Sequence, residues 1–477
     1  MAFSPFSRRH LLARGAAFSA GFAGFRTLMG SSGSSMAVAA ERLRDGVAAD
    51  GVGYGPLVED PHRIIDLPAG FTYRVIGKRG DVMSDGLFLP GHPDAMAAFP
   101  GPDADTTIII RNHELPIDAN RLSAFGPKLE LLAKVAPERM YDRGEGKTPA
   151  CGGTTTLVYD TRGQRVVKQF LSLAGTTQNC AGGMTPWGTW LSCEEDTTTP
   201  GKGAEKLHGY VFEVPASTAM EVTIPKPIKA MGRFRHEACA IDPASGVVFL
   251  TEDREDGLLY RYIPVDRTNL HAGGRLQALK VKDRPSLDTS NAGDAPVVTR
   301  GERLAVEWID VDEIDAPKDD LRLRGFAQGA AKFARNEGMW YGHGAVFFAA
   351  TSGGKALKGQ VWRYTPSAAE GTKAEIDAPG MLDLFIEPND GSVVENADNV
   401  TVAPWGDLLL CEDEAGPGDD ANRIVGVTPG GQLYHFARNA GSSSELAGAC
   451  FSPDGSTLFL NVQTDGLTLA INGPWRT

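Results

Sequence analysis

Carboxylates and one thiol recur in this sequence directly before or directly after short apolar runs. Before such runs stand Asp94, Asn179, Cys180, His236, Glu237, Arg335, Glu337, Asp398 and Glu445. After such runs stand His113, Glu114, Glu194, Glu195, Glu252, Asp253, Glu412 and Asp413. Carboxylate oxygens bind hard cations such as Ca²⁺, and a thiolate among them suits a transition metal. If the fold brings these positions together, the pattern predicts a site for several metal ions.

The apolar runs belong to a repeat. Residues 185–196, 242–254, 403–414 and 452–465 each contain Pro, then Gly, then an apolar run, and a fainter copy covers 99–114. Pro and Gly at this spacing form the turn of a β-hairpin. A further strand-like segment follows at 209–215, 257–264, 359–366 and 422–429, with looser copies at 155–160 and 466–473. A β unit that recurs about every 50 residues is typical of a propeller, so we predict an all-β, six-bladed β-propeller.

Two stretches interrupt the repeat, residues 115–150 and 265–336. The first contains a partly helical pattern over 122–140. The second contains a predicted strand over 304–311 and a predicted helix over roughly 318–335. We interpret both as insertions, with helical segments, in a single propeller domain that covers residues 40–477.

A propeller would bring the acidic residues together. In each blade the first strand leaves one rim and the second strand returns to it after the hairpin. Residues before the first strand and after the second strand therefore meet at one mouth of the central channel. Like charges this close repel each other, and bound cations remove the repulsion. A solvated acidic rim without metal is the alternative interpretation.

The N-terminus has the features of an export signal. Arg8 and Arg9 precede an Ala- and Gly-rich apolar stretch, and Ala37 to Ala39 fit a small-residue cleavage site. We therefore predict a twin-arginine signal peptide at residues 1–39, export by the twin-arginine translocase, and a periplasmic or secreted protein. The apolar stretch is short and only mildly hydrophobic, which disfavours a permanent membrane anchor.

Composition and missing motifs exclude several classes of function. The chain has 477 residues, 42% apolar and 22% charged, as in ordinary globular proteins, and a net charge of −13. That charge disfavours nucleic acid and anionic membranes as partners. The GEGKT stretch at 144–148 lacks the first Gly of a phosphate loop, and there is no HExxH or GxSxG motif. For the six cysteines, disulfides are the alternative to metal binding in an oxidising compartment.

Five segments resemble the PhoX family of alkaline phosphatases. They are NCAGGMTPWGTWLSCEED (179–196), GRFRHEACAID (232–242), FARNEGMW (333–340), NADNVTVAPWGDLLLCED (396–413) and ELAGACFSPDG (445–455). The resemblance covers about residues 60–470 and implies a six-bladed propeller that hydrolyses phosphomonoesters with two ferric ions and two or three calcium ions.

The resemblance also implies roles for single residues. Cys180, Glu237 and Glu337 match iron ligands, and Glu194, Glu195 and Asp398 match further metal ligands. Position on the rim adds Glu114, Glu412 and Glu445 as candidate metal ligands. Arg335 would contact phosphate, and we take Arg335 and Asn179 as the candidate catalytic residues.

We therefore predict an exported, metal-dependent phosphatase for phosphomonoesters. Two other functions compete with this interpretation. A calcium-dependent propeller lactonase needs one hard cation and has no use for a thiolate, so iron content separates it from a phosphatase. A non-enzymatic propeller that binds a partner on its rim would bind no iron and would have an apolar or aromatic rim.

The export signal gives a first prediction. Replacing Arg8 and Arg9 together by Lys should leave the protein in the cytoplasm, because a receptor reads the twin-arginine pair. Cell fractionation with an activity assay or immunoblot measures the effect. An unchanged periplasmic yield would rule out the twin-arginine route.

Overall fold

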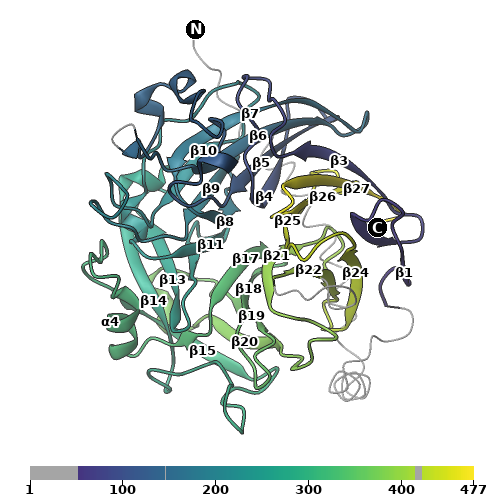
Figure 1. The fold of residues 1–477 in the computed structure, drawn as a ribbon. Helices are drawn as coiled ribbons and strands as arrows, with labels where there is room; N and C mark the ends of the chain where they lie inside the picture. Colours follow the sequence, from purple (N-terminus) through teal and green to yellow (C-terminus); the bar gives the residue numbers. More distant parts are fainter. Residues whose placement is uncertain (1–51, 145–146, 414–421, 477) are drawn as a thin grey trace. The chain divides into compact units, whose positions relative to one another are not determined.

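Strands make up nearly all of the regular structure in the computed structural model, which describes residues 52–144, 147–413 and 422–476 (Figure 1). Within these ranges the only α-helix is α4 (Leu321–Ala327). The prediction of an all-β fold is therefore confirmed. The predicted signal peptide at residues 1–39 lies outside the described residues. No described helix is long and apolar enough to span a membrane.

Six hairpins form the centre of the fold. Their first strands are β4 (Pro93–Pro100), β8 (Asn179–Met184), β11 (His236–Ile241), β17 (Asn336–Gly342), β21 (Ala397–Val402) and β25 (Leu446–Phe451). Their second strands are β5 (Thr106–His113), β9 (Thr189–Glu194), β12 (Val248–Glu252), β18 (Ala345–Ala350), β22 (Leu408–Glu412) and β26 (Thr457–Val462). All six pairs are antiparallel.

The outer strands extend these hairpins. The third strands are β6 (Gly152–Asp160), β10 (Val211–Pro215), β13 (Gly257–Pro264), β19 (Gln360–Thr365), β23 (Arg423–Val427) and β27 (Leu467–Asn472). The fourth strands are β7 (Arg165–Thr176), β14 (Gly274–Val281), β20 (Met381–Ile386), β24 (Leu433–Asn439) and β3 (Thr72–Lys78). Short or extra strands are β1 (Leu57–Val58), β2 (Ile65–Pro68), β15 (Arg303–Asp310) and β16 (Lys332–Phe333). Each predicted third segment overlaps one of the third strands.

The first strands form a ring. β4 contacts β8, β8 contacts β11, β11 contacts β17, β17 contacts β21, β21 contacts β25, and β25 contacts β4 again. The hydrogen-bonded sheets number five, because β15 pairs with both β14 and β20 and so joins two hairpin units into one ten-stranded sheet. The propeller-like arrangement is thus confirmed, but six separate sheets are not seen in the described residues.

Strands near the ring are buried on both faces. The sequences of β12, β18 and β26 are buried at every position. Sheets that pack on both sides favour continuous apolar runs, and that explains why the repeat shows runs instead of strict alternation. The N-terminal strands complete the C-terminal sheets, since β3 pairs with β27 and β2 pairs with β24.

The two insertions differ from their predicted form. Between residues 122 and 140, where a partly helical pattern is predicted, the structure has 3₁₀ turns and no α-helix, because Pro127 and Pro137 interrupt the helical pattern. The turns of this insertion are Asn120–Leu122, Leu132–Lys134 and Pro137–Arg139. In the second insertion the helix predicted over 318–335 is shortened to α4. It ends before Gly329, whose φ is +108°, and β16 follows.

Candidate metal centre

The candidate residues lie at one end of the ring, where the first strands begin and the second strands end; we call this end the mouth. Each first strand there has a register shift directly after its first pairing positions, between Pro93 and Met96, Asn179 and Gly182, His236 and Cys239, Asn336 and Met339, Ala397 and Val400, and Ala447 and Cys450. Such bulges leave residues unpaired and redirect their side chains. The unpaired residues of five strands include Asp94, Cys180, Glu237, Glu337 and Asp398.

Ends of the second strands add further carboxylates. Strand alternation sends successive side chains to opposite sides. The last residues of β9, β12 and β22 are Glu194, Glu252 and Glu412, and their side chains turn back into the blades. The next residue in each case is Glu195, Asp253 or Asp413, whose carboxylate lies at the mouth. The pair His113 and Glu114 after β5 follows the same rule.

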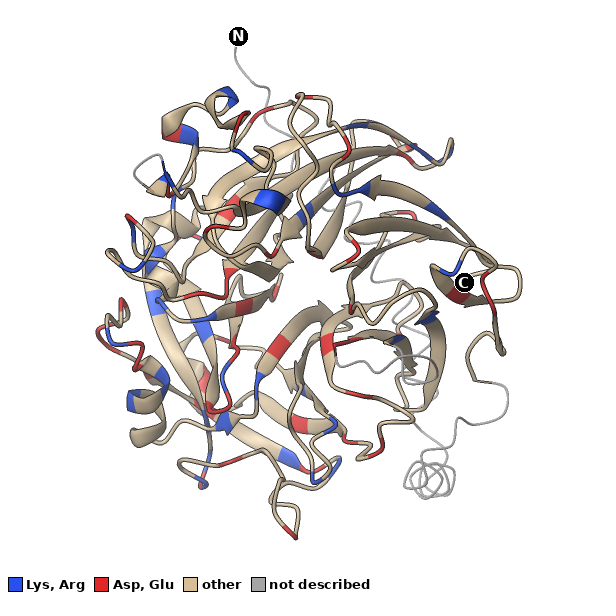
Figure 2. Cartoon of the chain, in the orientation of Figure 1, with Lys and Arg blue, Asp and Glu red and all other residues tan. Residues whose placement is uncertain are grey.

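Four groups of possible ligand atoms form at the mouth, each with all its atoms within 4.8 Å of one another. They are Cys180 with Glu195 and Glu237, Glu237 with Glu337 and Asp398, Asp398 with Asp413 and Glu445, and Asp94 with Glu114 and Glu445. Glu237, Asp398 and Glu445 each belong to two groups. The groups therefore form one continuous cluster, which we call the acidic cluster. Figure 2 shows acidic positions on the inner strands as well as on the outer loops.

The acidic cluster is electrostatically unfavourable without cations. Burial raises the pKa of Glu237 and Glu337, and neighbouring carboxylates raise it further. Burial likewise raises the pKa of Glu114 and of Asp398 to about 7. Two like charges 4 Å apart repel by about 4 kcal/mol at an effective dielectric constant of 20. The Oδ1 atom of Asp94 is buried and has no hydrogen-bond partner among the described residues, so its lone pairs can bind a cation.

Cys180 is the one thiol in the acidic cluster. Its side chain is buried, and its Sγ lies 3.6 Å from the carbonyl oxygen of His236 and 3.8 Å from that of Glu237. Burial and the surrounding carboxylates raise the pKa of the Cys180 thiol. A metal would reverse that shift, because metal-bound thiols are deprotonated. All six cysteines are free, so the disulfide alternative is not seen.

Arg335 bridges two of the mouth carboxylates. Its Nε and Nη2 donate to the two oxygens of Asp253 at 2.9 and 3.0 Å, and Nη2 also donates to Glu337 at 2.6 Å. Arg335 has a φ of +56°, in the left-handed region, directly before β17. The structure thus brings Arg335 and Glu337 together. The predicted helix does not reach Arg335, because α4 ends well before it.

Three candidate residues lie outside the acidic cluster. Glu194 accepts hydrogen bonds from the backbone amides of Thr177, Gly209 and Tyr210 and from His208. Glu412 is paired with Arg423 and accepts the amide of Glu395. Asn179 is fully buried, accepts from the Thr176 hydroxyl and donates to Ser192. Their polar atoms form hydrogen bonds inside the blades, so the structure does not bring these three residues into the ligand groups, and their predicted roles stay predictions.

Three acids at the mouth are missing from the ligands predicted from the sequence, although they stand on the predicted rim. Asp94 and Asp413 belong to the acidic cluster, and Asp253 pairs with Arg335 beside it. Strand alternation could have identified two of them from the sequence. In each acidic pair at the end of a second strand, the first acid turns into the blade and the second turns toward the mouth. Gln463 occupies the same position after β26, and its Nε2 donates to Asp94 at 3.2 Å and to Glu114 at 2.8 Å.

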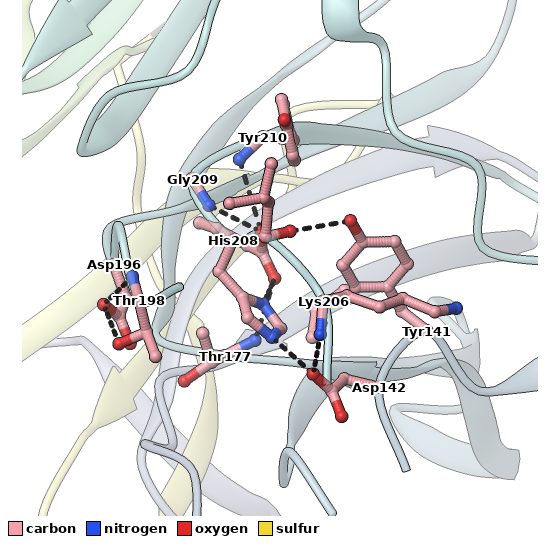
Figure 3. A network of polar contacts seen from close by, with 12 residues as sticks. Tyr141, Asp142, Thr177, Asp196, Thr198, Lys206, His208, Gly209 and Tyr210 are labelled. Atoms are coloured by element: carbon pink, nitrogen blue, oxygen red, sulfur yellow. Dashed lines mark hydrogen bonds and ion pairs between the residues drawn. The ribbon is translucent and has the colours of Figure 1, made fainter. Parts of the chain in front are cut away.

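Behind the mouth, Glu194 takes part in a buried ionic network with His208 and Asp142. Figure 3 shows His208 and Asp142 of this network from close by. His208 donates from Nδ1 to Glu194 at 2.7 Å and from Nε2 to Asp142 at 3.1 Å. Burial alone would lower the pKa of His208, but the two carboxylates raise it to about 10. Hydrogen bonds outweigh burial at Asp142 and lower its pKa to about 2.

Comparisons with known proteins agree with this arrangement. A family model described as alkaline phosphatase PhoX matches residues 52–466. The fold is similar to that of Pseudomonas fluorescens PhoX, solved in complex with vanadate, a transition state analogue, with a TM-score of 0.63, 19% identity, and coverage of 88% of this chain and 97% of that chain.

A gluconolactonase from Xanthomonas campestris also matches, over 89% of this chain and 99% of that one, at 10% identity. Its TM-score of 0.34 is too low to bear on fold or function. A search of curated protein sequences gave no match.

The network around His208 predicts a pH dependence of stability. Since folding raises the pKa of His208 from 6.5 to about 10, its contribution is complete below pH 6.5 and is lost as the pH rises toward 10. Denaturant unfolding at several pH values should show that the free energy of unfolding falls over this range. His208→Gln should lower the free energy of unfolding by about 3–5 kcal/mol at pH 7 and make it depend less on pH. The same pH dependence in the wild type and the variant would contradict the buried ion network.

Proposed function

Since the chain belongs to the PhoX family of alkaline phosphatases and is a phosphoric monoester hydrolase, we propose that the acidic cluster is its active site. The observation that supports this most directly is the sharing of ligands. Glu237, Asp398 and Glu445 each link two groups, so the donor set suits several metal ions side by side. A substrate phosphoryl group would bind on the solvent side of these ions.

The donor chemistry divides the acidic cluster in two. The group of Cys180, Glu195 and Glu237 contains a thiol, and it shares Glu237 with the group that contains Glu337. We propose that these two groups hold two ferric ions, since a thiolate selects a transition metal over calcium. The other two groups contain only carboxylates, which suit two or three calcium ions.

Metals held there would polarise the phosphoryl oxygens and lower the pKa of a bound water. The protein itself supplies orientation and positive charge. Arg335 stands at the edge of the acidic cluster with 36% of its side chain exposed, while Glu337 and Asp253 below it are buried. Its planar guanidinium can donate two parallel hydrogen bonds to a phosphoryl group and stabilise the charge that develops in the transition state.

Two further features complete the proposal. The closed ring of six first strands supports a count of six blades, with β15 as a bridge between two of them. Arg8 and Arg9 support export through the twin-arginine translocase to the periplasm or the medium, with residues 1–39 as the signal. Because that route carries folded proteins, the metals could be bound before export.

The alternative function of a propeller lactonase with one calcium ion is disfavoured by Cys180. A single hard cation needs no thiolate, and Cys180 lies in a group with two carboxylates. A binding rim without metal is disfavoured as well, because it would leave the buried acidic cluster without counter-charge.

The role of Cys180 can be tested against a matched cysteine. Cys180→Ser should fold but lose iron and activity, because a serine hydroxyl is a much poorer metal ligand than a thiolate. Cys151→Ser should keep both, since Cys151 is also buried but belongs to no ligand group, and its Sγ contacts Asn120 and Pro149. Elemental analysis and a phosphatase assay on both variants decide the matter. Equal iron content in the two variants would exclude a thiolate ligand.

Arg335 and Glu337 predict two different defects. Arg335→Ala should retain its metals but lose about 2–4 kcal/mol of transition-state stabilisation, or about 10²–10³ in rate. Glu337→Gln should lose metal as well as activity. Glu252→Gln is the control, because Glu252 is an equally buried carboxyl that bonds Tyr260 inside the blade. Full activity in Arg335→Ala, or full metal content in Glu337→Gln, would refute the corresponding role.

A further inference from the structure

Two arginines occupy equivalent positions in neighbouring hairpin units. Arg235 directly precedes β11, and Arg335 directly precedes β17. In both units the next residue pairs with the end of the second strand, and a bulge follows. Two positions beyond each arginine stands a buried glutamate of the acidic cluster, Glu237 or Glu337. β11 and β17 are in direct contact, so the two arginines belong to adjacent parts of the mouth.

Arg235 and Arg335 are linked through two carboxylates. Arg235 Nη1 lies 3.2 Å from Glu195 Oε1, and its backbone oxygen accepts the amide of Asp253 at 3.3 Å. Arg335 grips the carboxylate of the same Asp253. Next to burial, the charge of Asp253 is the largest cause that raises the pKa of Glu195, so these two carboxylates are close neighbours. Each guanidinium group therefore pairs with one member of the neighbouring Glu195 and Asp253 carboxylates.

Both arginines lie on the solvent side of the carboxylates. The side chains of Arg235 and Arg335 are 33% and 36% exposed, whereas that of Glu195 is 12% exposed and that of Asp253 is 6% exposed. An anion that approaches from solvent therefore reaches the guanidinium groups before the acids. A cation held by Cys180, Glu195 and Glu237 would take over the charge of Glu195, which leaves the Arg235 guanidinium available for that anion.

We propose that Arg235 is a second substrate-binding residue, which contacts the phosphoryl group together with Arg335. This inference rests on the proposed function of the acidic cluster. The planar fork of an arginine matches the oxygens of a phosphoryl group and donates two parallel hydrogen bonds to them. Two such forks beside the Glu195 and Asp253 carboxylates would hold the phosphoryl group over the cluster and offset the negative field of a protein with net charge −13.

A purely structural ion pair makes a different prediction. A partly exposed pair such as Arg235 with Glu195 contributes little to stability and nothing to phosphate affinity. The affinity for inorganic phosphate, which is the reaction product, therefore separates the two roles without depending on turnover.

The test compares Arg235→Gln with Arg284→Gln in the metal-loaded, full-length protein. Arg284 is the matched control, because it is 32% exposed and pairs with Glu302 at 3.0 Å outside the acidic cluster. We expect Arg235→Gln to weaken phosphate binding in calorimetry, and to raise KM for p-nitrophenyl phosphate, by about tenfold or more, with unchanged iron and calcium content. Arg284→Gln should match the wild type in all three measurements.

If Arg235→Gln fails to fold, Arg235→Lys is used instead. The lysine keeps the positive charge but not the planar guanidinium, so phosphate binding should be weakened severalfold. Wild-type phosphate affinity in the variants would overturn the inference, and so would a loss of phosphate binding that only follows a loss of metal. If the wild type itself neither binds phosphate nor hydrolyses the ester, the proposed function fails first. If the wild type does both and the Arg235 variants match it, only the role of Arg235 fails.

Discussion

Repulsion among buried carboxylates is the constraint on which the rest of this structure depends. Glu237, Glu337 and Asp94 are each less than a tenth exposed, and their ligand oxygens lie within 4.8 Å of other acids. Burial removes the water that would normally screen them, and the neighbouring charges raise their pKa values together. A protein can hold such a group in one place only if cations or protons balance it. The exposed guanidinium groups of Arg235 and Arg335 balance only part of the charge.

Strand geometry decides which acids enter the acidic cluster and which stay out. Bulges in the first strands turn Glu237 and Glu337 toward the mouth, and alternation after the second strands does the same for Glu195. The inward-facing partner of Glu195 is Glu194, which forms the buried network with His208. Each acidic pair thus combines one residue for the site with one that fixes the blade behind it. Hydrogen bonding of the inner residue holds the backbone that presents the outer one.

Much of this could be predicted from the sequence, because the repeat reports strand ends directly. The Pro and Gly turns and the apolar runs located the hairpins, and the acids beside them located the mouth. Glu194 and Glu412 are predicted ligands that lie outside the ligand groups, and each stands one position before an acid that belongs to a group. Their exclusion depends on partners distant in sequence or on another strand, such as His208 and Arg423.

Other parts of the fold depend on contacts that no local pattern reveals. The pairing of β15 with β20, which joins two hairpin units, connects strands far apart in the chain. The helix predicted over 318–335 is shorter in the structure, because α4 ends at Ala327, before the positive φ of Gly329. Arg235 matches Arg335 in sequence context, but only the ion pairs show that Arg235 contacts Glu195 and Arg335 contacts Asp253 at the mouth.

Elemental analysis of the protein purified after export tests the central claim most directly, because it counts the cations that balance the acidic cluster. A multinuclear centre predicts about two iron atoms and at least two calcium ions per chain, and removal of these ions by a chelator should lower the unfolding temperature because the carboxylates then repel each other. A protein that contains neither iron nor calcium, with the same unfolding temperature before and after chelation, would contradict the proposal of a multinuclear metal centre.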